Sequence, residues 1–144
     1  MAAPRDVFTR ILFALLVMAG LAAGCRSTEP AVPAASLIGT SWLAEEIDGQ
    51  RALERVESTL SFDSAQRITG QAACNRYFGT LELGEGTIRL RPSGTTRMAC
   101  APAVMAQESR FFAALGAVSA FRREADKLVL LDESGRVRVR LART

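Results

Sequence analysis

The strongest constraint on the fold is an alternation of apolar and polar residues that recurs in short runs along the chain. It is clearest in RVRVRLA (136–142), where Val137, Val139 and Leu141 share one face and the arginines share the other. STLSF (58–62) alternates in the same way. Turn-forming stretches such as DG, LGEG and DESG separate the runs. The pattern predicts a mainly β fold, with an antiparallel sheet that has one face on the core and one face in water.

One segment, PAVMAQESRFFAALGAV (102–118), lacks this period of two. It is rich in alanine, and Pro102 is well placed for the first turn of a helix. At about 100° per residue, its apolar residues fall on one stripe of a helix. Those residues are Val104, Phe111, Leu115 and Val118. We therefore expect one α-helix that covers an end or an open side of a strongly curved sheet.

The first 24 residues are typical of a secretory signal peptide. Arg5 and Arg10 precede the apolar run ILFALLVMAGLAA (11–23), which is shorter than the roughly 20 residues needed to span a bilayer. The run leads into LAAGC, which resembles the lipobox of bacterial lipoproteins. This resemblance implies cleavage before Cys25 and acylation of that residue, which anchors the chain in a membrane. An ordinary signal peptide with a cysteine near its end is the alternative.

The residues after Cys25 indicate where the chain is anchored and how it is organised. Arg26 stands where an aspartate commonly retains lipoproteins in the inner membrane, so we expect the periplasmic face of the outer membrane. Residues 25–36 contain prolines and small residues without periodicity, which predicts a flexible tether. Residues 37–144 have the length of one domain. The formal net charge of only +3 gives no reason to expect a nucleic-acid partner.

The cysteines outside the signal favour a disulfide. The chain has three cysteines and no histidine, so Cys74 and Cys100 remain as a pair in an oxidising compartment once Cys25 is lipidated. A zinc site would need further ligands, which only carboxylates could supply. A nucleophilic Cys74 would lack the imidazole that usually activates a thiol. We expect the disulfide, and the metal site and the nucleophile stay open as alternatives.

Four stretches together resemble the META domain family, the family of the heat-inducible lipoprotein HslJ. They are GTSWLAEEIDG, QAACNRYFG, TTRMAC and KLVLLDESG. The resemblance covers nearly all of residues 37–144. It implies a small antiparallel β-barrel or half-barrel, lipocalin-like, with one α-helix packed on it. It also implies a role in heat or envelope stress and, in some members, in antibiotic tolerance, but it supplies no reaction. Ala73 stands where the family usually has glycine, so a positive φ there would be strained.

Glu108 interrupts the apolar stripe of the expected helix, because it lies about 40° from Val104 at 100° per residue. A carboxylate in that position must be neutral or paired, since an unpaired buried charge is very costly. The nearest candidates in sequence to the two cysteines are Arg76 and Arg97. We expect Glu108, one of these arginines and Asn75 to form a polar cluster that ties the helix to the sheet. A structural role is favoured over ligand binding.

Residue types argue against an enzyme. Without histidine, Ser-His-Asp and Cys-His arrangements are impossible, and neither a zinc-protease motif nor a phosphate-binding glycine loop is present. Glu45 with Glu46, or Glu82 with Glu85, could be imagined as an acid and base pair. Neighbouring residues on a strand point to opposite faces, however, and the second pair brackets a turn. We expect no catalysis, no cofactor and no metal.

Two non-catalytic functions remain open from the sequence. One is an envelope accessory protein, a tethered module that binds or chaperones another envelope protein. The other is a carrier that holds a small ligand or a lipid inside the barrel. Five phenylalanines are expected to point inward and fill so small a barrel, which favours the first function. They are Phe62, Phe78, Phe111, Phe112 and Phe121.

Alternating arginines form a further candidate surface. They lie in two of the predicted strands and are Arg89, Arg91, Arg136, Arg138 and Arg140. Such a face suits anionic lipid phosphates or an acidic partner. The simpler interpretation, which we favour, is a solvated face that also discourages pairing between sheet edges.

Overall fold

The computed structural model describes residues 33–144. The expected signal peptide (1–24), Cys25 and the tether up to residue 32 lie outside the described residues. The elements are η1 (Ala34–Leu37), β1 (Ser41–Ile47), β2 (Gln50–Arg51), β3 (Thr59–Ser64), β4 (Arg67–Gln71), β5 (Arg76–Leu83), β6 (Ile88–Thr95), α2 (Pro102–Ala117), β7 (Ala120–Glu124), β8 (Lys127–Leu131) and β9 (Val137–Arg143). Residues 34–36, expected as the end of the tether, therefore form part of a short 3-10 helix.

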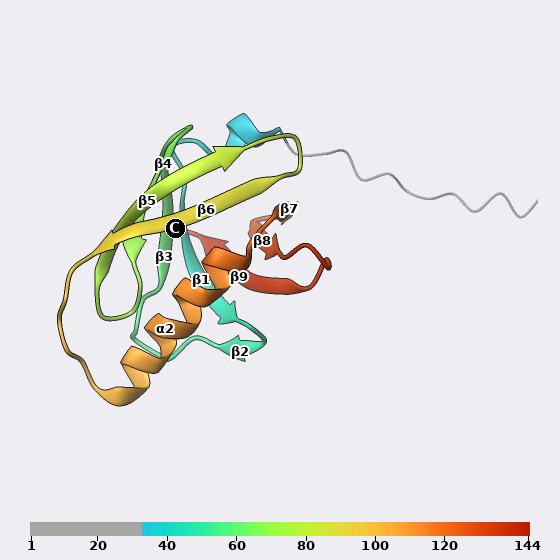
Figure 1. Cartoon of the computed structure of the whole chain (residues 1–144). Helices are drawn as coiled ribbons and strands as arrows, with labels where there is room; N and C mark the ends of the chain where they lie inside the picture. Colours follow the sequence, from blue (N-terminus) through green and yellow to red (C-terminus); the bar gives the residue numbers. More distant parts are fainter. Residues whose placement is uncertain (1–32) are drawn as a thin grey trace, which may run out of the picture. The chain divides into compact units, whose positions relative to one another are not determined.

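All strands of the described residues join one antiparallel sheet in the order β6-β5-β4-β3-β1-β9-β8-β7, with β2 paired to β1. The sheet curls until its two edges approach each other. There the backbone N–H of Ile88 donates to the carbonyl of Ser119 at 3.0 Å, and Thr87 forms an isolated bridge with Ala120. Helix α2 crosses the open side (Figure 1). The predicted mainly β half-barrel with one α-helix is confirmed.

Helix α2 spans the predicted segment. Pro102 occupies its first turn, where a missing N–H costs nothing. Phe111 and Leu115 are fully buried, Val118 just after the helix is 4 % exposed, and Val104 is half-buried. The apolar stripe therefore faces the sheet as its period requires. No helix among residues 33–144 is long and apolar enough to cross a membrane.

Large side chains fill the inside of the half-barrel. Trp42, Phe62 and Phe111 are fully buried, together with leucines and isoleucines from both halves of the sheet. Each fully buried large apolar side chain contributes roughly 1.5–3 kcal/mol to the stability. In the alternating runs 58–62 and 136–142, the sequence predicts the inward face correctly, because Leu60, Phe62, Val139 and Leu141 are fully buried.

Phe78 does not belong to this interior, so the prediction that it points inward is wrong. Its neighbours Tyr77 and Gly79 on β5 are inward and buried, whereas Phe78 is 52 % exposed on the outer face. It pairs with Gly94 on β6, where an added Cβ would collide with the phenylalanine ring. The ring therefore covers a glycine that has no side chain of its own to pack.

The turn between β4 and β5 has an unusual backbone at Ala73. Its φ is +94°, in the region that favours glycine. Two backbone hydrogen bonds stabilise the turn. The N–H of Ala72 donates to the carbonyl of Asn75 at 2.7 Å, and the N–H of Ala73 donates to the carbonyl of Glu57 at 3.0 Å. Alanine adopts this φ only with strain, so the chain carries strain at Ala73.

We predict that Ala73→Gly raises the free energy of unfolding by about 1 kcal/mol, because relief of the strained φ exceeds the added entropy of the unfolded chain. Urea denaturation of the purified domain measures the change. Ala72→Gly is the matched control: Ala72 is fully buried and has no positive φ, so the same change should destabilise. An Ala73→Gly variant no more stable than the parent would contradict the strain.

Candidate functional site

The carboxylate of Glu108, on α2, is bound by the turn between β4 and β5. Its Oε2 accepts from the backbone N–H of Asn75 at 2.7 Å and of Cys74 at 3.1 Å, and its Oε1 accepts from Nδ2 of Asn75 at 2.9 Å. Glu108 is only 7 % exposed. Three N–H donors therefore satisfy a carboxylate that has lost most of its water.

Asn75 extends the same network to the chain that leaves β6. Its Oδ1 accepts from the N–H of Met98 at 2.7 Å and from the hydroxyl of Thr96 at 2.8 Å. Its Nδ2 also lies 3.2 Å from the carbonyl of Met98. One asparagine thus joins the β4–β5 turn, the segment after β6 and α2. We call Glu108, Asn75, Thr96 and Met98, with the N–H of Cys74, the Glu108 clamp.

A disulfide between Cys74 and Cys100 closes the clamp covalently, with the two Cα atoms 6.0 Å apart. The prediction of this bond is confirmed. Because both sulfurs are bonded to each other, neither is free to bind zinc or to act as a nucleophile. Cys74 is 3 % exposed, whereas Cys100 lies at the surface.

The expected arginine partner of Glu108 is not found. Arg76 and Arg97 are both exposed, and no ion pair within residues 33–144 joins either of them to Glu108. The expected contact between Glu108 and Asn75 is present. The physical reason for the difference is that two backbone N–H groups and the side-chain amide of Asn75 already bind both oxygens of the carboxylate, so no side-chain cation is needed.

Gln107 is a buried polar residue that sequence reasoning missed. It is fully buried; its Oε1 accepts from the N–H of Leu53 at 2.7 Å, and its Nε2 donates to Val56 at 3.3 Å and to Ser58 at 3.1 Å. Its position about 60° from Val104 on the helical wheel was the available signal. Adjacent residues of α2 therefore hold two different loops.

Tyr77 packs beside the clamp and joins the sheet to α2. Its ring meets Phe111 at 6.1 Å and Phe112 at 5.4 Å between centroids, both edge-on. Its hydroxyl donates to the carbonyl of Thr59 at 2.8 Å, and burial raises the pKa of the phenol. The phenol is therefore neutral and serves as a donor.

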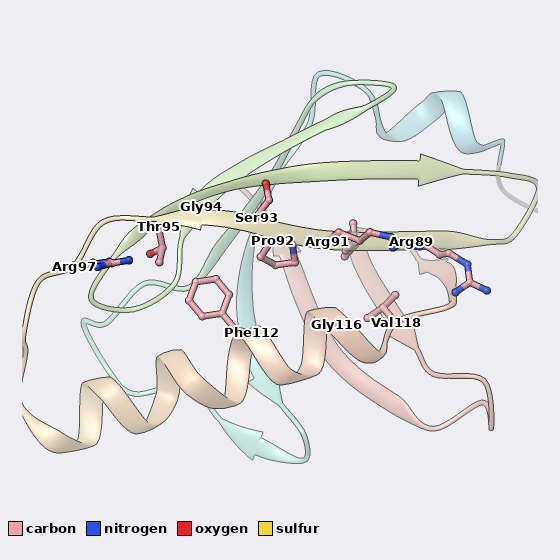
Figure 2. Close-up of a pocket in the computed structure, with 11 residues that line it drawn as sticks. Arg89, Arg91, Pro92, Ser93, Gly94, Thr95, Arg97, Phe112, Gly116 and Val118 are labelled. Atoms are coloured by element: carbon pink, nitrogen blue, oxygen red, sulfur yellow. The ribbon is translucent and has the colours of Figure 1, made fainter.

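An open groove runs between β6 and α2, with a cavity volume of about 710 Å³. Arg89 and Arg97 lie at its two ends, and Phe112 points from the helix toward the strand (Figure 2). The strand side of the lining runs from Arg89 to Thr95, and the helix side includes Gly116 and Val118. We call this hollow the β6–α2 groove. Sequence reasoning did not predict it, because no local pattern reports how far an edge strand lies from a helix.

The alternating arginines Arg136, Arg138 and Arg140 do not form a free basic face. Nη2 of Arg138 donates to Oδ2 of Asp48 at 3.0 Å, Arg136 lies 3.7 Å from the same carboxylate, and Arg140 lies 3.3 Å from Glu124. These side chains are charge-paired across neighbouring turns and strands. The favoured interpretation of a solubilising surface thus fits β9.

The arginines of the β6–α2 groove differ from those of β9. Within residues 33–144, Arg89 and Arg97 form no ion pair, and Arg91 has only a 3.8 Å contact with Glu82, in which both side chains are mostly exposed. Such an exposed pair contributes little. Arg89 and Arg97 therefore have no carboxylate within ion-pair distance among the described residues.

The sequence pattern of the META domain matches residues 35–144. The chain belongs to the META domain family. No curated protein is similar enough to count as a match. The META domain of this chain is similar to an NMR structure of a protein from Burkholderia xenovorans, with 28 % identity, a TM-score of 0.61, and coverage of 81 % of this chain and 90 % of the other. It shares its fold with a second NMR structure, at 21 % identity and a TM-score of 0.61, covering 77 % and 94 %.

The Glu108 clamp and the disulfide join two of the four segments that carry the resemblance to the META domain. CNRYFG supplies Cys74 and Asn75, and TRMAC supplies Met98 and Cys100. The clamp holds together the β4–β5 turn, the segment after β6 and α2. None of its members is free to act as an acid, a base or a nucleophile. Its arrangement supports a structural role.

We predict that Glu108→Ala lowers the free energy of unfolding by about 3 kcal/mol. The change removes the acceptor of two backbone N–H groups and of the Asn75 amide, which are left without a hydrogen bond in a buried site. Glu108→Gln keeps one acceptor but places an amide near Asn75, so an intermediate loss is expected. The exposed neighbour Ser109 provides the control, since Ser109→Ala should change stability little. Chemical denaturation that finds Glu108→Ala as stable as Ser109→Ala would disprove the clamp's role.

A separate prediction concerns the disulfide. The oxidised domain should show no thiol after denaturation, and reduction should destabilise it by about 3–4 kcal/mol, because the bond closes a long loop. Thiol titration in denaturant, followed by unfolding with and without reductant, measures both. Two titratable thiols in freshly purified exported protein would contradict the bond.

Proposed function

We propose that this META domain protein is a lipid-anchored, non-catalytic accessory module at the periplasmic face of the outer membrane. It acts there by binding another envelope component under envelope stress or antibiotic challenge. The lipobox-like LAAGC ending at Cys25 supports the anchor. The family resemblance supports the envelope role.

The observation that carries the proposal is the filled interior of the half-barrel. Trp42, Phe62 and Phe111 have no exposed surface, and Leu128, Leu130 and Leu141 are equally buried. A carrier in the manner of larger barrels needs an internal space for its ligand. The alternative function as a lipid or small-ligand carrier is therefore the weaker one, and binding at the outer surface is favoured.

Side-chain chemistry also favours binding over catalysis. No group of three or more His, Cys, Asp or Glu residues within residues 33–144 is placed to hold a metal ion. Glu45, one of the candidate carboxylates, is hydrogen-bonded to Lys127 at 2.6 Å and is exposed. Glu82 likewise faces Arg91 on the surface. These carboxylates fit a solvated surface.

The anchor is tested by Cys25→Ala. We expect the variant to remain uncleaved or to leave the membrane fraction, because the acylated residue is the proposed attachment. Fractionation and mass of the mature chain measure this, with Ser27→Ala as a control outside the lipobox. A Cys25→Ala protein that is cleaved and retained normally would remove the lipoprotein assignment.

The partner is tested by crosslinking in intact cells, with a photoreactive residue on the outer surface and one in the interior as a control. An envelope protein captured from surface positions alone supports the accessory module. A lipid captured from the interior position would support the carrier instead.

A further inference from the structure

We propose that the β6–α2 groove binds an extended acidic peptide segment of the envelope partner. This inference rests on the proposed function, because it assigns a surface to the binding role. It is carried by the charge of the groove, by its length and by the chemistry of its strand edge.

The charged side chains that line the groove are all positive. Arg89, Arg91 and Arg97 line it, and none of the described residues that line it is acidic. By contrast, Arg136, Arg138 and Arg140 each lie within 4.0 Å of a carboxylate. Planar guanidinium groups bind carboxylates in a bidentate way. We therefore expect the bound peptide to supply the carboxylates that pair with these arginines.

The length of the groove favours a peptide over a single phosphate or headgroup. Its strand wall, β6, has 8 residues, which extend over roughly 25 Å at about 3.3 Å per residue. Arg89 lies near the start of β6, and Arg97 lies two residues beyond its end (Figure 2). One compact anion cannot contact both arginines, whereas carboxylates spaced along an extended chain can.

The middle of the groove provides an apolar contact. Phe112 is half-buried and points into the space between strand and helix, and Val118 lies toward one end (Figure 2). An aliphatic or aromatic side chain between two acidic residues would cover this surface. The pattern expected of the occupant is thus acidic residues that flank an apolar one.

The strand edge favours recognition by side chains. β6 is an edge strand, and Pro92 in its middle has no N–H to donate. An added strand, from a partner or from a second copy of this chain, would lose a hydrogen bond at this point. The arginines and the apolar contact are therefore the main determinants of binding.

Gly116 allows a test that changes no charge. It lies on the helix side of the groove, and a Cβ added there meets no other heavy atom within 4 Å. Gly116→Trp should fill the groove without disturbing the fold. Ala113→Trp is its control, because Ala113 is exposed on the same helix and does not line the groove.

The probe is a fluorescein-labelled peptide of about eight residues that alternates glutamate with valine and phenylalanine. Its control has glutamine in place of glutamate. Fluorescence anisotropy should show binding of the acidic peptide alone, weakened by salt. Gly116→Trp should abolish binding and Ala113→Trp should leave it unchanged.

A charge-reversal pair tests the arginines. Arg89→Glu with Arg97→Glu should weaken binding by about tenfold or more. Arg51→Glu with Arg143→Glu changes the net charge equally at exposed positions outside the groove and should have a much smaller effect. Equal losses in the two double variants would mean that net charge, and not the groove, attracts the peptide.

Other outcomes would overturn the proposal. No binding to the parent up to about 1 mM peptide would exclude an acidic peptide. Binding to phosphatidylglycerol vesicles without peptide binding would assign the groove to lipid headgroups. A dimer in sedimentation that Gly116→Trp dissociates would assign it to a second copy. If Gly116→Trp keeps the partner crosslinks in cells, the groove assignment fails while the proposed function stands.

Discussion

The carboxylate of Glu108 and the backbone N–H groups of Cys74 and Asn75 form the interaction on which the packing of α2 depends. A helix that packs across an open sheet buries only one face. In α2, two positions of that face are polar: Gln107 and Glu108. Glu108 holds the β4–β5 turn and Gln107 holds the loop after β2. These bonds fix the register and direction of the helix, which apolar contacts alone leave free to slide.

Strand and helix positions could be predicted from the sequence because periodicity is a local property. The alternation around Leu60, the alternation around Val139 and the start of the helix at Pro102 each follow from neighbouring residues. The exposed position of Phe78 could not be predicted, because its ring packs over Gly94, which lies on another strand. From the sequence alone, an exposed aromatic residue that covers a glycine cannot be distinguished from an aromatic residue of the core.

The partner of Glu108 shows where sequence reasoning ends. The sequence shows that a buried carboxylate needs hydrogen-bond donors or a positive charge. It suggests arginine because arginine is the positive residue found near the cysteines in the sequence. The donors are instead the side-chain amide of Asn75 and two main-chain N–H groups. Every residue except proline carries such an N–H, so the sequence does not reveal which ones are used. They converge because the turn is bent at Ala73, with φ at +94°. The backbone conformation, and not composition, therefore selects the partner.

The order of the strands gives the first strand of the domain a neighbour from the last. β1 lies between β3 and β9 in the centre of the sheet, and Trp42 of β1 is opposite Arg143 near the C-terminus. During synthesis, β1 therefore stays unpaired on one side until β9 has been made. Closure of the sheet depends on this long-range contact and is expected to be slow. Loss of β9 would remove a strand from the middle of the sheet and separate β8 and β7 from β1.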